Sequence, residues 1–339
     1  MACFQQRVNH FRNHYELTRK DLLVKNLKRM KRQVERIEGA PEGEKFNFFP
    51  TTFVLPQEYS LLLEEFKRVE GNWIMKPVGR SQGKGIFLFN KLSQISEWKQ
   101  NSKWVAKTGT APPSAETYIA QRYIQRPYLI GGKKFDLRLY CLVDSFSPLS
   151  AWVHRNGFAR FSNTAYSEAK QDLSNTFMHL TNHSIQKTAS SYDKDQGVKW
   201  GVYDLRMFLL TRHSSSEVGK LFEDIQDLII RSLLSVQQTM IQDKHSFELY
   251  GYDVLFDQDL KPWLIEVNAS PSITKSNEED HQLKFDVLND LVDVIDVEGK
   301  RSRDEKNVRG FDLVYHGEQV TSKSMIGCHY QTSSLPERF

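Results

Sequence analysis

Two carboxylates and one amide in the last third of the chain could together bind a divalent metal ion. Residues 250–272 read YGYDVLFDQDLKPWLIEVNASPS, a pattern typical of a β-hairpin that turns at residues 258–260. Period-two alternation then places Asp253, Glu266 and Asn268 on one face, where their oxygen atoms converge. Two adjacent carboxylates repel each other unless a cation lies between them. Hard oxygen ligands suit Mg²⁺, which also binds substrate phosphates, so the sequence predicts a magnesium site here.

The expected register of this hairpin decides which side chains share a face. If the two carboxylates pair across the strands, Leu255 faces Leu264, because paired positions in an antiparallel hairpin have a constant sum. The same rule pairs Gly251 with Asn268. The opposite face is then apolar and consists of Val254, Phe256, Trp263, Ile265 and Val267. A surface hairpin with scattered acids is the alternative, and it leaves Glu266 as an unexplained charge among apolar residues.

A second stretch, WIMKPVGRSQGKGIFL at residues 73–88, combines a lysine with a glycine-bearing turn. Lys76 ends an apolar strand, where its ammonium group could reach a phosphate. Gly83 and Gly85 flank Lys84, and such a loop offers backbone N–H groups and a flexible cation to a polyphosphate. The spacing matches neither GxxxxGK[ST] nor GxGxxG, and an ordinary turn is the alternative for this segment.

Isolated charges in apolar surroundings form a third group of candidates. The group consists of Lys134, Asp136, Arg138, Arg160 and Lys199. Arg160 in GFARF needs a carboxylate or phosphate partner, whereas Asp136 in KFDLR could simply pair with a neighbouring base. His179 in HLTN is interpreted as a structural histidine rather than a metal ligand. The sequence has no His/Cys cluster with zinc spacing and no GxSxG, HRD or DFG motif, which disfavours hydrolases and protein kinases.

These candidates depend on a mixed set of helices and strands for their positions. Apolar residues at helical spacing predict one helix from Pro56, a second after a serine cap at residues 214–216, and a third at 279–295. Short strands are predicted at residues 73–77, 85–89, 118–123 and 135–143. The order shows no regular βαβ alternation, so we predict an α+β fold.

Residues 19–36 predict a strongly basic helix, because they include eight basic and two acidic side chains. Its apolar stripe consists of Leu23, Leu27, Met30, Val34 and Ile37. The opposite face could be a solvated surface or a docking site for a polyanion, either nucleic acid or an acidic protein tail. The segment lacks interleaved aromatic residues, which makes nucleic acid the weaker alternative.

The composition of the whole chain limits the classes of protein. Its 339 residues are 39% hydrophobic and 26% charged, with a net charge of +4. The sequence has no apolar run near the ~18 residues of a membrane span, and its start does not resemble a secretory signal. Cys3, Cys141 and Cys328 lie far apart and predict no disulfide framework. We therefore expect a globular protein of the cytoplasm, without a membrane partner.

Several motifs follow one another along residues 9–295: NHFRNHYELTRKDLL, MKP with GKGI, QRYI, GGKKFDLR, GFARF, HLTN, and YGYD with KPWLIEVNASPS. Together they resemble the tubulin tyrosine ligase-like family, and within it the tubulin polyglutamylase branch. The resemblance implies an ATP-grasp fold, in which two α+β lobes hold ATP between antiparallel sheets. The domains that we then expect are a shortened basic N-terminal lobe at 1–70, a central lobe at 71–125, a C-terminal lobe with the metal site at 126–296 and a charged, mobile tail at 297–339.

The resemblance also implies roles for individual residues. Nucleotide contacts are implied for Lys76, Ser81, Gln82, Gly83, Lys84, Gly85, Ile86, Gln121, Arg122, Tyr123, Ile124, Lys134, Asp136, Thr181 and Asn182. The family's magnesium ligands match Asp253, Glu266 and Asn268, in agreement with the hairpin geometry. Arg160 matches the arginine that holds the carboxylate of incoming glutamate, and Arg160 and Glu266 are the expected catalytic residues. Other amino-acid contacts fall near His183, Ser184, Lys199 and Lys284.

The implied activity is ATP-dependent ligation of glutamate to the γ-carboxylate of glutamates in tubulin C-terminal tails, through an acyl phosphate. The expected cofactors and partners are ATP, Mg²⁺, free L-glutamate, microtubules and accessory subunits, and nucleic acid is not among them. A glycine or tyrosine ligase is one alternative, although Arg160 argues against glycine, which has no side-chain carboxylate. A catalytically silent microtubule-binding protein is the other. The family further implies a location in the cytoskeleton, at cilia and basal bodies.

Overall fold

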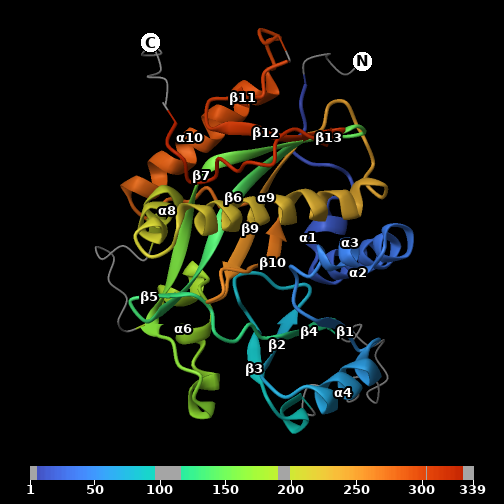
Figure 1. Cartoon of the computed structure of the whole chain (residues 1–339), viewed down its shortest axis with the longest axis vertical. Coiled ribbons are helices and arrows are strands. Elements are labelled where there is room, and N and C mark those ends of the chain that lie inside the picture. The colour runs from blue at the N-terminus through green and yellow to red at the C-terminus, as the bar shows by residue number, and fades with distance from the viewer. Residues whose placement is uncertain (1–5, 96–115, 190–198, 303, 331–339) are drawn as a thin grey trace, which may run out of the picture.

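The computed structural model describes residues 6–95, 116–189, 199–302 and 304–330, and Figure 1 shows how they are arranged. Every ladder between the named strands of this part is antiparallel, and the strands form two sheets. Helices and antiparallel strands are therefore mixed, as the α+β prediction requires. Each described helix is too short or too polar to cross a lipid bilayer.

The smaller sheet lies below the larger one in Figure 1 and has the strand order β1-β4-β2-β3. Its strands are β1 (Thr52–Leu55), β2 (Trp73–Pro77), β3 (Phe87–Phe89) and β4 (Tyr118–Arg122). Helix α4 (Tyr59–Arg68) covers one face, where Leu62 and Phe66 pack on Trp73. The predicted strands at 73–77 and 118–123 are confirmed, whereas the strand predicted from residue 85 begins two residues later.

The larger sheet has the order β10-β9-β6-β7-β12-β11, with β5, β8 and β13 paired to β6, β7 and β12. Its strands are β5 (Leu129–Ile130), β6 (Lys133–Phe146), β7 (Leu149–Ala165), β8 (Lys199–Gly201), β9 (Glu248–Phe256), β10 (Pro262–Asn268), β11 (Asn307–Val308), β12 (Phe311–His316) and β13 (Glu318–Gln319). The predicted strand at 135–143 is thus the middle of β6. Its long partner β7 was not predicted.

Two long helices cover opposite faces of the larger sheet. Helix α9 (Ser215–Gln237) packs on the face that carries Leu137 and Tyr252, and α10 (Glu278–Ile295) packs on the face that carries Leu142. Alternate residues of a strand point to opposite faces, which is why Leu137 and Leu142 of β6 belong to different cores. The predicted serine cap of α9 is confirmed, because Ser214 forms a reciprocal capping box with Glu217.

The basic helix forms as predicted and packs beside α9. Helix α2 (Lys20–Glu38) buries Leu23 and Leu27, and Met30 and Val34 pack on the same core. Ile37 is 66% exposed, so the predicted apolar stripe ends one turn early. The remaining short elements are α1 (Tyr15–Thr18), α3 (Ala40–Glu44), η1 (Leu92–Ile95), η3 (Lys170–Ser174), α6 (Thr176–His179), α7 (His183–Gln186) and α8 (Val202–Leu210).

Two of the predicted domain limits differ from the structure. Strand β1 and helix α4 share a core with β2 and β4, so the limit at residue 70 divides the smaller sheet. The mobile tail predicted from residue 297 is wrong for residues 307–319, because β12 pairs with β7 and buries Phe311 and Val314. Residues 331–339 lie outside the described part of the chain.

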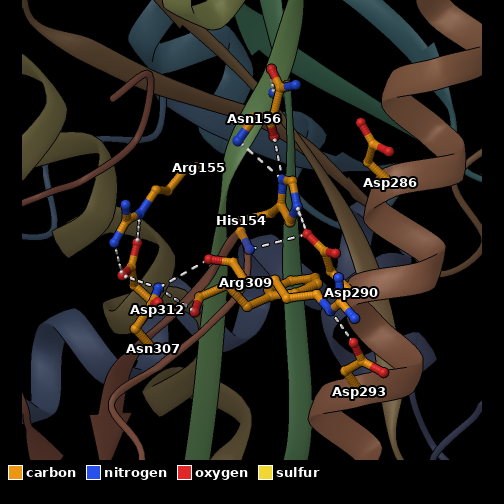
Figure 2. Close-up of polar contacts among 12 residues, drawn as sticks. His154, Arg155, Asn156, Asp286, Asp290, Asp293, Asn307, Arg309 and Asp312 are labelled. Carbon is orange, nitrogen blue, oxygen red and sulfur yellow. Dashed lines mark hydrogen bonds and ion pairs between the residues drawn. The ribbon is translucent and has the colours of Figure 1, made fainter. Parts of the chain in front are cut away.

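Polar contacts hold the C-terminal strands onto the sheet (Figure 2). Arg155 on β7 donates two hydrogen bonds of 2.7 Å to the carboxylate of Asp312 on β12. His154, the residue before Arg155 on β7, is buried and places Nε2 3.2 Å from Oδ2 of Asp290, a residue of α10. The backbone N–H of Gly310 donates to the same Asp290 oxygen at 3.0 Å. The segment that leads into β12 is therefore fixed to both β7 and α10.

Gly310→Ala is expected to lower the free energy of unfolding by about 1–3 kcal/mol, as over-packing a filled interior does. A Cβ atom there would lie 2.4 Å from His154 Nε2 and 2.8 Å from Asp290 Oδ2, and both groups are buried. Gly219→Ala in α9 is the control, because its Cβ meets open space and alanine favours a helix by roughly 0.5–1 kcal/mol. Urea unfolding followed by circular dichroism measures both changes, and an unaltered Gly310→Ala midpoint would contradict the packing argument.

Candidate active site

A cavity lies between the smaller sheet and the β9–β10 hairpin, and most of the predicted site residues line it. These are Lys76, Ser81, Gln82, Gly83, Ile86, Gln121, Arg122, Tyr123, Ile124, Lys134, Asp136, Thr181, Asn182, Asp253, Glu266 and Asn268. Predicted residues outside the lining are Lys84, Gly85, Arg160, Ser184, Lys199 and Lys284. His183 begins α7, and its side chain is outside the described part of the structure. Predicted motifs that lie nearly 200 positions apart in the sequence therefore meet at one cavity.

The hairpin register confirms the predicted pairing of the polar residues but not that of the apolar ones. Asp253 pairs with Glu266 and Gly251 with Asn268, as expected. A β-bulge between Leu264 and Glu266 shifts the rest of the ladder, so the expected Leu255–Leu264 pair does not form.

The same bulge changes which apolar side chains face the cavity. Ile265 lines the cavity beside Glu266, whereas Leu264 lies in the core. The prediction that Trp263 and Ile265 share the core face with Val254 is therefore wrong. An extra residue in one strand reverses the alternation beyond it, and periodicity alone does not reveal that residue.

Asp253 is 2% exposed and lies between two guanidinium groups. Arg138 donates from Nε to Oδ1 at 2.6 Å and from Nη2 to Oδ2 at 3.1 Å, and Arg160 Nη2 lies 2.8 Å from Oδ2. Burial raises the pKa of a carboxyl group, but the two arginines outweigh burial and hold the pKa of Asp253 far below its usual range. This carboxylate stays ionised at any physiological pH.

Arg160 also binds Asp136, which faces it across the β6–β7 ladder. Its Nε donates to Oδ1 of Asp136 at 3.0 Å, and its Nη2 donates to Oδ2. Burial lowers the pKa of a guanidinium, but Asp136 and Asp253 together raise the pKa of Arg160 well above its usual value. Asp136 thus has a basic partner, the buried Arg160, and it also lines the cavity.

Glu266 is the more accessible carboxylate of the hairpin, with a side chain that is 21% exposed. Its Oε2 lies 3.3 Å from Nζ of Lys20, the first residue of α2. Asn268 Nδ2 lies 3.5 Å from Oδ2 of Asp253. Lys20 also lines the cavity, but in the sequence it was indistinguishable from the other bases of its helix. The carboxylate and amide oxygens of this face suit a hard divalent cation.

Two buried lysines line the cavity, Lys76 from β2 of the smaller sheet and Lys134 from β6 of the larger sheet. Lys76 Nζ donates to Gln121 Oε1 at 2.7 Å, and Lys134 Nζ donates to the carbonyl oxygen of His179 at 2.9 Å. Burial lowers the pKa of Lys76 to about 8, although Glu266 opposes that effect. Burial also lowers the pKa of Lys134 to about 7, against the opposing charge of Asp136. An anion in the cavity would restore the charged form of both.

His179 is satisfied by neighbouring protein groups, as the structural interpretation predicted. Its Nδ1 lies 2.9 Å from the hydroxyl oxygen of Tyr123, and its Nε2 lies 3.0 Å from the carbonyl oxygen of Asp172. The pKa of His179 is lowered, first by burial. It therefore positions Tyr123 at the cavity wall.

The glycine-bearing loop reaches across the cavity to α7. Gly83 has φ +76°, and a Cβ atom there would lie 2.3 Å from Ile185 Cδ1. Ser184 Oγ donates to the carbonyl oxygen of Gln82 at 3.0 Å. Ser184, predicted as an amino-acid contact, therefore holds the loop in this structure. The close approach needs a residue without a side chain, which is the physical reason for glycine here.

Lys199 and Lys284 meet at one carboxylate outside the cavity lining. Asp280 receives Lys199 Nζ at Oδ1 (3.0 Å) and Lys284 Nζ at Oδ2 (2.8 Å). Burial opposes ionisation of Asp280, but the two lysines outweigh it and lower the pKa of that carboxyl group. Lys199 pairs with Arg160 in the β7–β8 ladder, so these lysines lie next to the arginines that contact Asp253.

Comparison with known proteins agrees with these features. The probable tubulin polyglutamylase TTLL9 of Bos taurus is 49% identical over an alignment of 340 positions, which covers 93% of this chain and 73% of that protein. The probable alpha-tubulin polyglutamylase Ttll1 of Tetrahymena thermophila is 45% identical over 303 residues, 86% of this chain and 72% of that protein. The tubulin polyglutamylase TTLL5 of Homo sapiens is 36% identical over 305 residues, 86% of this chain and 22% of that protein. Residues 2–305 match the tubulin-tyrosine ligase family, and the chain belongs to that family.

Proposed function

We propose that this chain is an ATP-dependent tubulin polyglutamylase, which joins glutamate to glutamate side chains of tubulin C-terminal tails. The observation that carries the proposal is one cavity that is lined by two buried lysines together with Asp253, Glu266 and Asn268. Such a site suits a polyphosphate with a bound divalent cation. Relatives at 45–49% identity over most of the chain bear polyglutamylase names, which supports the same substrate here.

In this proposal the fold is an ATP-grasp, and the two sheets hold ATP between them. Lys76 and Lys134 bind its phosphates, and the loop at residues 81–86 covers them with backbone N–H groups. The segment at residues 121–124 meets the adenine, while Asp136, Thr181 and Asn182 contact the rest of the nucleotide. Gln121 orients Lys76 through the 2.7 Å hydrogen bond between them.

Asp253, Glu266 and Asn268 are the proposed ligands of Mg²⁺. Their oxygen atoms are hard donors on one wall of the cavity, and the cation would neutralise charge on the ATP phosphates. Arg138 and Arg160 keep Asp253 ionised, and Lys20 holds Glu266. Asp253 is therefore held in the deprotonated form that metal binding needs.

The proposed reaction has two steps. A γ-carboxylate oxygen of the acceptor attacks the γ-phosphorus of ATP, the bond to the β-phosphate oxygen breaks, and ADP leaves with an acyl phosphate formed. The amine of free glutamate then attacks the acyl carbon, loses a proton, and displaces phosphate to give an isopeptide bond. Basic side chains stabilise the negative charge that develops at phosphorus and at the acyl carbon. Arg160, Lys199 and Lys284 form the proposed cationic wall for glutamate.

The basic face of α2 is the proposed contact for the acidic tubulin tail. Lys25 and Arg29 lie on this helix, which begins with Lys20 in the cavity, so a tail along it leads to the reacting atoms. Long-range attraction between a basic face and an acidic tail falls with salt. We further propose that the protein works at the cytoskeleton, including cilia and basal bodies, with accessory subunits as further partners.

Incubation of the purified chain with microtubules, ATP and isotope-labelled glutamate tests the proposal. We expect label in the C-terminal tails, located by mass spectrometry, and none in tubulin whose tails have been removed. Labelled glycine and tyrosine in parallel reactions distinguish the other ligase activities. Microtubule binding without any incorporation would favour the silent binding protein instead.

Nucleotide binding is expected to take up roughly one proton near pH 7.5, because phosphates restore the ordinary pKa of Lys76 and Lys134 from about 8 and about 7. Affinity should therefore fall as pH rises through this range, since the free protein must first gain the proton. Calorimetry in buffers of different ionisation enthalpy measures the uptake. Lys76→Arg keeps a permanent charge and should remove its share of the uptake. A binding heat that is independent of the buffer would contradict the contact between these lysines and the phosphates.

A further inference from the structure

A second cluster of ligating side chains lies away from the proposed active site. His10, His14 and Glu248 each offer one atom, and these three atoms lie within 4.8 Å of one another. Glu248 begins β9 and Asp253 follows five residues later, which is roughly 17 Å along a strand. The two side chains also point to opposite faces of the sheet, because their positions differ by an odd number. The cluster is therefore separate from the cavity.

Both histidines lie near the same carboxylate oxygen, at distances close to that between two ligands of a tetrahedral metal ion. His10 Nδ1 lies 2.9 Å from Glu248 Oε1, and His14 Nδ1 lies 3.8 Å from the same oxygen. Ligands at 2.0–2.1 Å from a tetrahedral Zn²⁺ are about 3.3 Å from each other, so the two distances bracket that value.

The second oxygen of Glu248 has partners of its own, which fix the carboxylate. Oε2 accepts hydrogen bonds from the backbone N–H of Phe11 at 3.0 Å and from the hydroxyl group of Tyr250 at 3.1 Å. Such outer partners orient a metal ligand and are part of most protein metal sites. Oε1 is thus left to face the two histidines.

The segment that carries the histidines is held firmly against the core. Asn13 donates to the carbonyl oxygen of Thr239 and accepts the N–H of Ile241 at 2.9 Å. Phe11 is fully buried, and Val8 forms a bridge with Ser246. Ligands on both chain segments therefore have fixed positions, as a selective metal site requires.

The exposure of the three side chains leaves room for a further ligand. Glu248 is fully buried, whereas the side chains of His10 and His14 are 44% and 32% exposed. Solvent can therefore reach the fourth corner of the site. Two imidazoles and one carboxylate are a ligand set that zinc takes together with a water molecule.

We propose that His10, His14 and Glu248 bind one Zn²⁺ ion, which ties the segment before α1 to the start of β9. The ion would neutralise the charge of the buried carboxylate and link two parts of the chain that lie more than 230 positions apart. This site is independent of the proposed ligase activity, because it shares no residue with the cavity.

The test uses the purified chain after dialysis against a chelator. Titration with Zn²⁺ should give one equivalent of zinc bound per chain and a higher unfolding temperature. Co²⁺ in its place should give the visible absorption bands of a tetrahedral site. Excess Mg²⁺ is present throughout, so that hard-oxygen sites such as the cavity are saturated. Glu266→Gln should keep the full zinc stoichiometry, which separates this site from the proposed magnesium ligands.

Tyr250→Phe removes an outer partner of Glu248 and should weaken zinc binding by about 10-fold. His14→Gln removes a ligand itself and should weaken zinc binding by more than about 100-fold, which is the largest loss expected for an outer partner. His281→Gln is the matched control, because His281 is an exposed histidine beside Glu278 on α10. Circular dichroism checks that each variant is folded. Equal zinc binding by the wild type and His14→Gln, or an absence of tetrahedral cobalt bands, would overturn the proposal and leave the histidines as hydrogen-bond partners of Glu248.

Discussion

Glu266→Gln is expected to reduce glutamate incorporation by about 10³-fold or more, because it removes a ligand of the proposed Mg²⁺ ion, which would position the reacting phosphates and neutralise their charge. Glutamine has nearly the same size and keeps one acceptor oxygen, so the side chain can still occupy its place beside Lys20. The Lys20–Glu266 ion pair, which this variant loses, is partly exposed and contributes about 0.2–1 kcal/mol to the free energy of unfolding. The free energy of unfolding should therefore change by no more than that amount. Initial rates of labelled glutamate incorporation, together with urea unfolding, measure both quantities.

Glu58→Gln is the matched control for this variant. Glu58 pairs with Lys28 of α2 at 3.1 Å, and its side chain is 29% exposed against 21% for Glu266. The two glutamates thus lose the same type of ion pair with the same helix, but only Glu266 lines the cavity. Glu58→Gln should keep nearly full activity. Normal incorporation by Glu266→Gln would show that this carboxylate is not a metal ligand.

The polar face of the hairpin was predictable because it depends on local pairing. The Asp253–Glu266 register follows from a turn and a period of two, and the structure has that pair. The bulge at Ile265 was not predictable, since an extra residue leaves no mark in a run of apolar side chains. Local regularity therefore gave the polar positions correctly and the apolar partners beyond the bulge wrongly.

Residues brought in by distant elements could not be predicted from their own segments. Lys20 looked like one of many bases on a helix, and only the packing of α2 beside β10 takes it to Glu266. Arg138 was recognised as a charge in an apolar strand, but its pairing with Asp253 requires β6 and β9 to be neighbours. Strand β12 was missed within a charged, Ser/Thr-rich segment, although FDLVYH in that segment contains the aromatic and β-branched residues that strands favour.

Loss of Arg160 is expected to affect stability and glutamate use together, because this guanidinium serves two buried carboxylates. Arg160→Gln leaves Asp136 without its cation at 5% exposure, and removal of one partner from a buried pair costs about 3–5 kcal/mol. The same variant removes one of the two cations that contact Asp253. It also removes the cationic partner of Lys199 in the β7–β8 ladder. Incorporation at increasing glutamate concentrations should show a raised KM, while nucleotide binding persists in the folded fraction.

Two further variants separate the stability effect from the glutamate effect. Arg155→Gln removes a bidentate arginine–carboxylate pair from the same strand, with Asp312 as partner, and should lower stability while leaving the KM for glutamate unchanged. Adding Asp136→Asn to Arg160→Gln removes the uncompensated charge and should recover part of the lost stability. If that double variant also recovers the wild-type KM for glutamate, Arg160 acts only by balancing Asp136. If the KM stays high in a stable protein, the guanidinium itself is needed to bind glutamate.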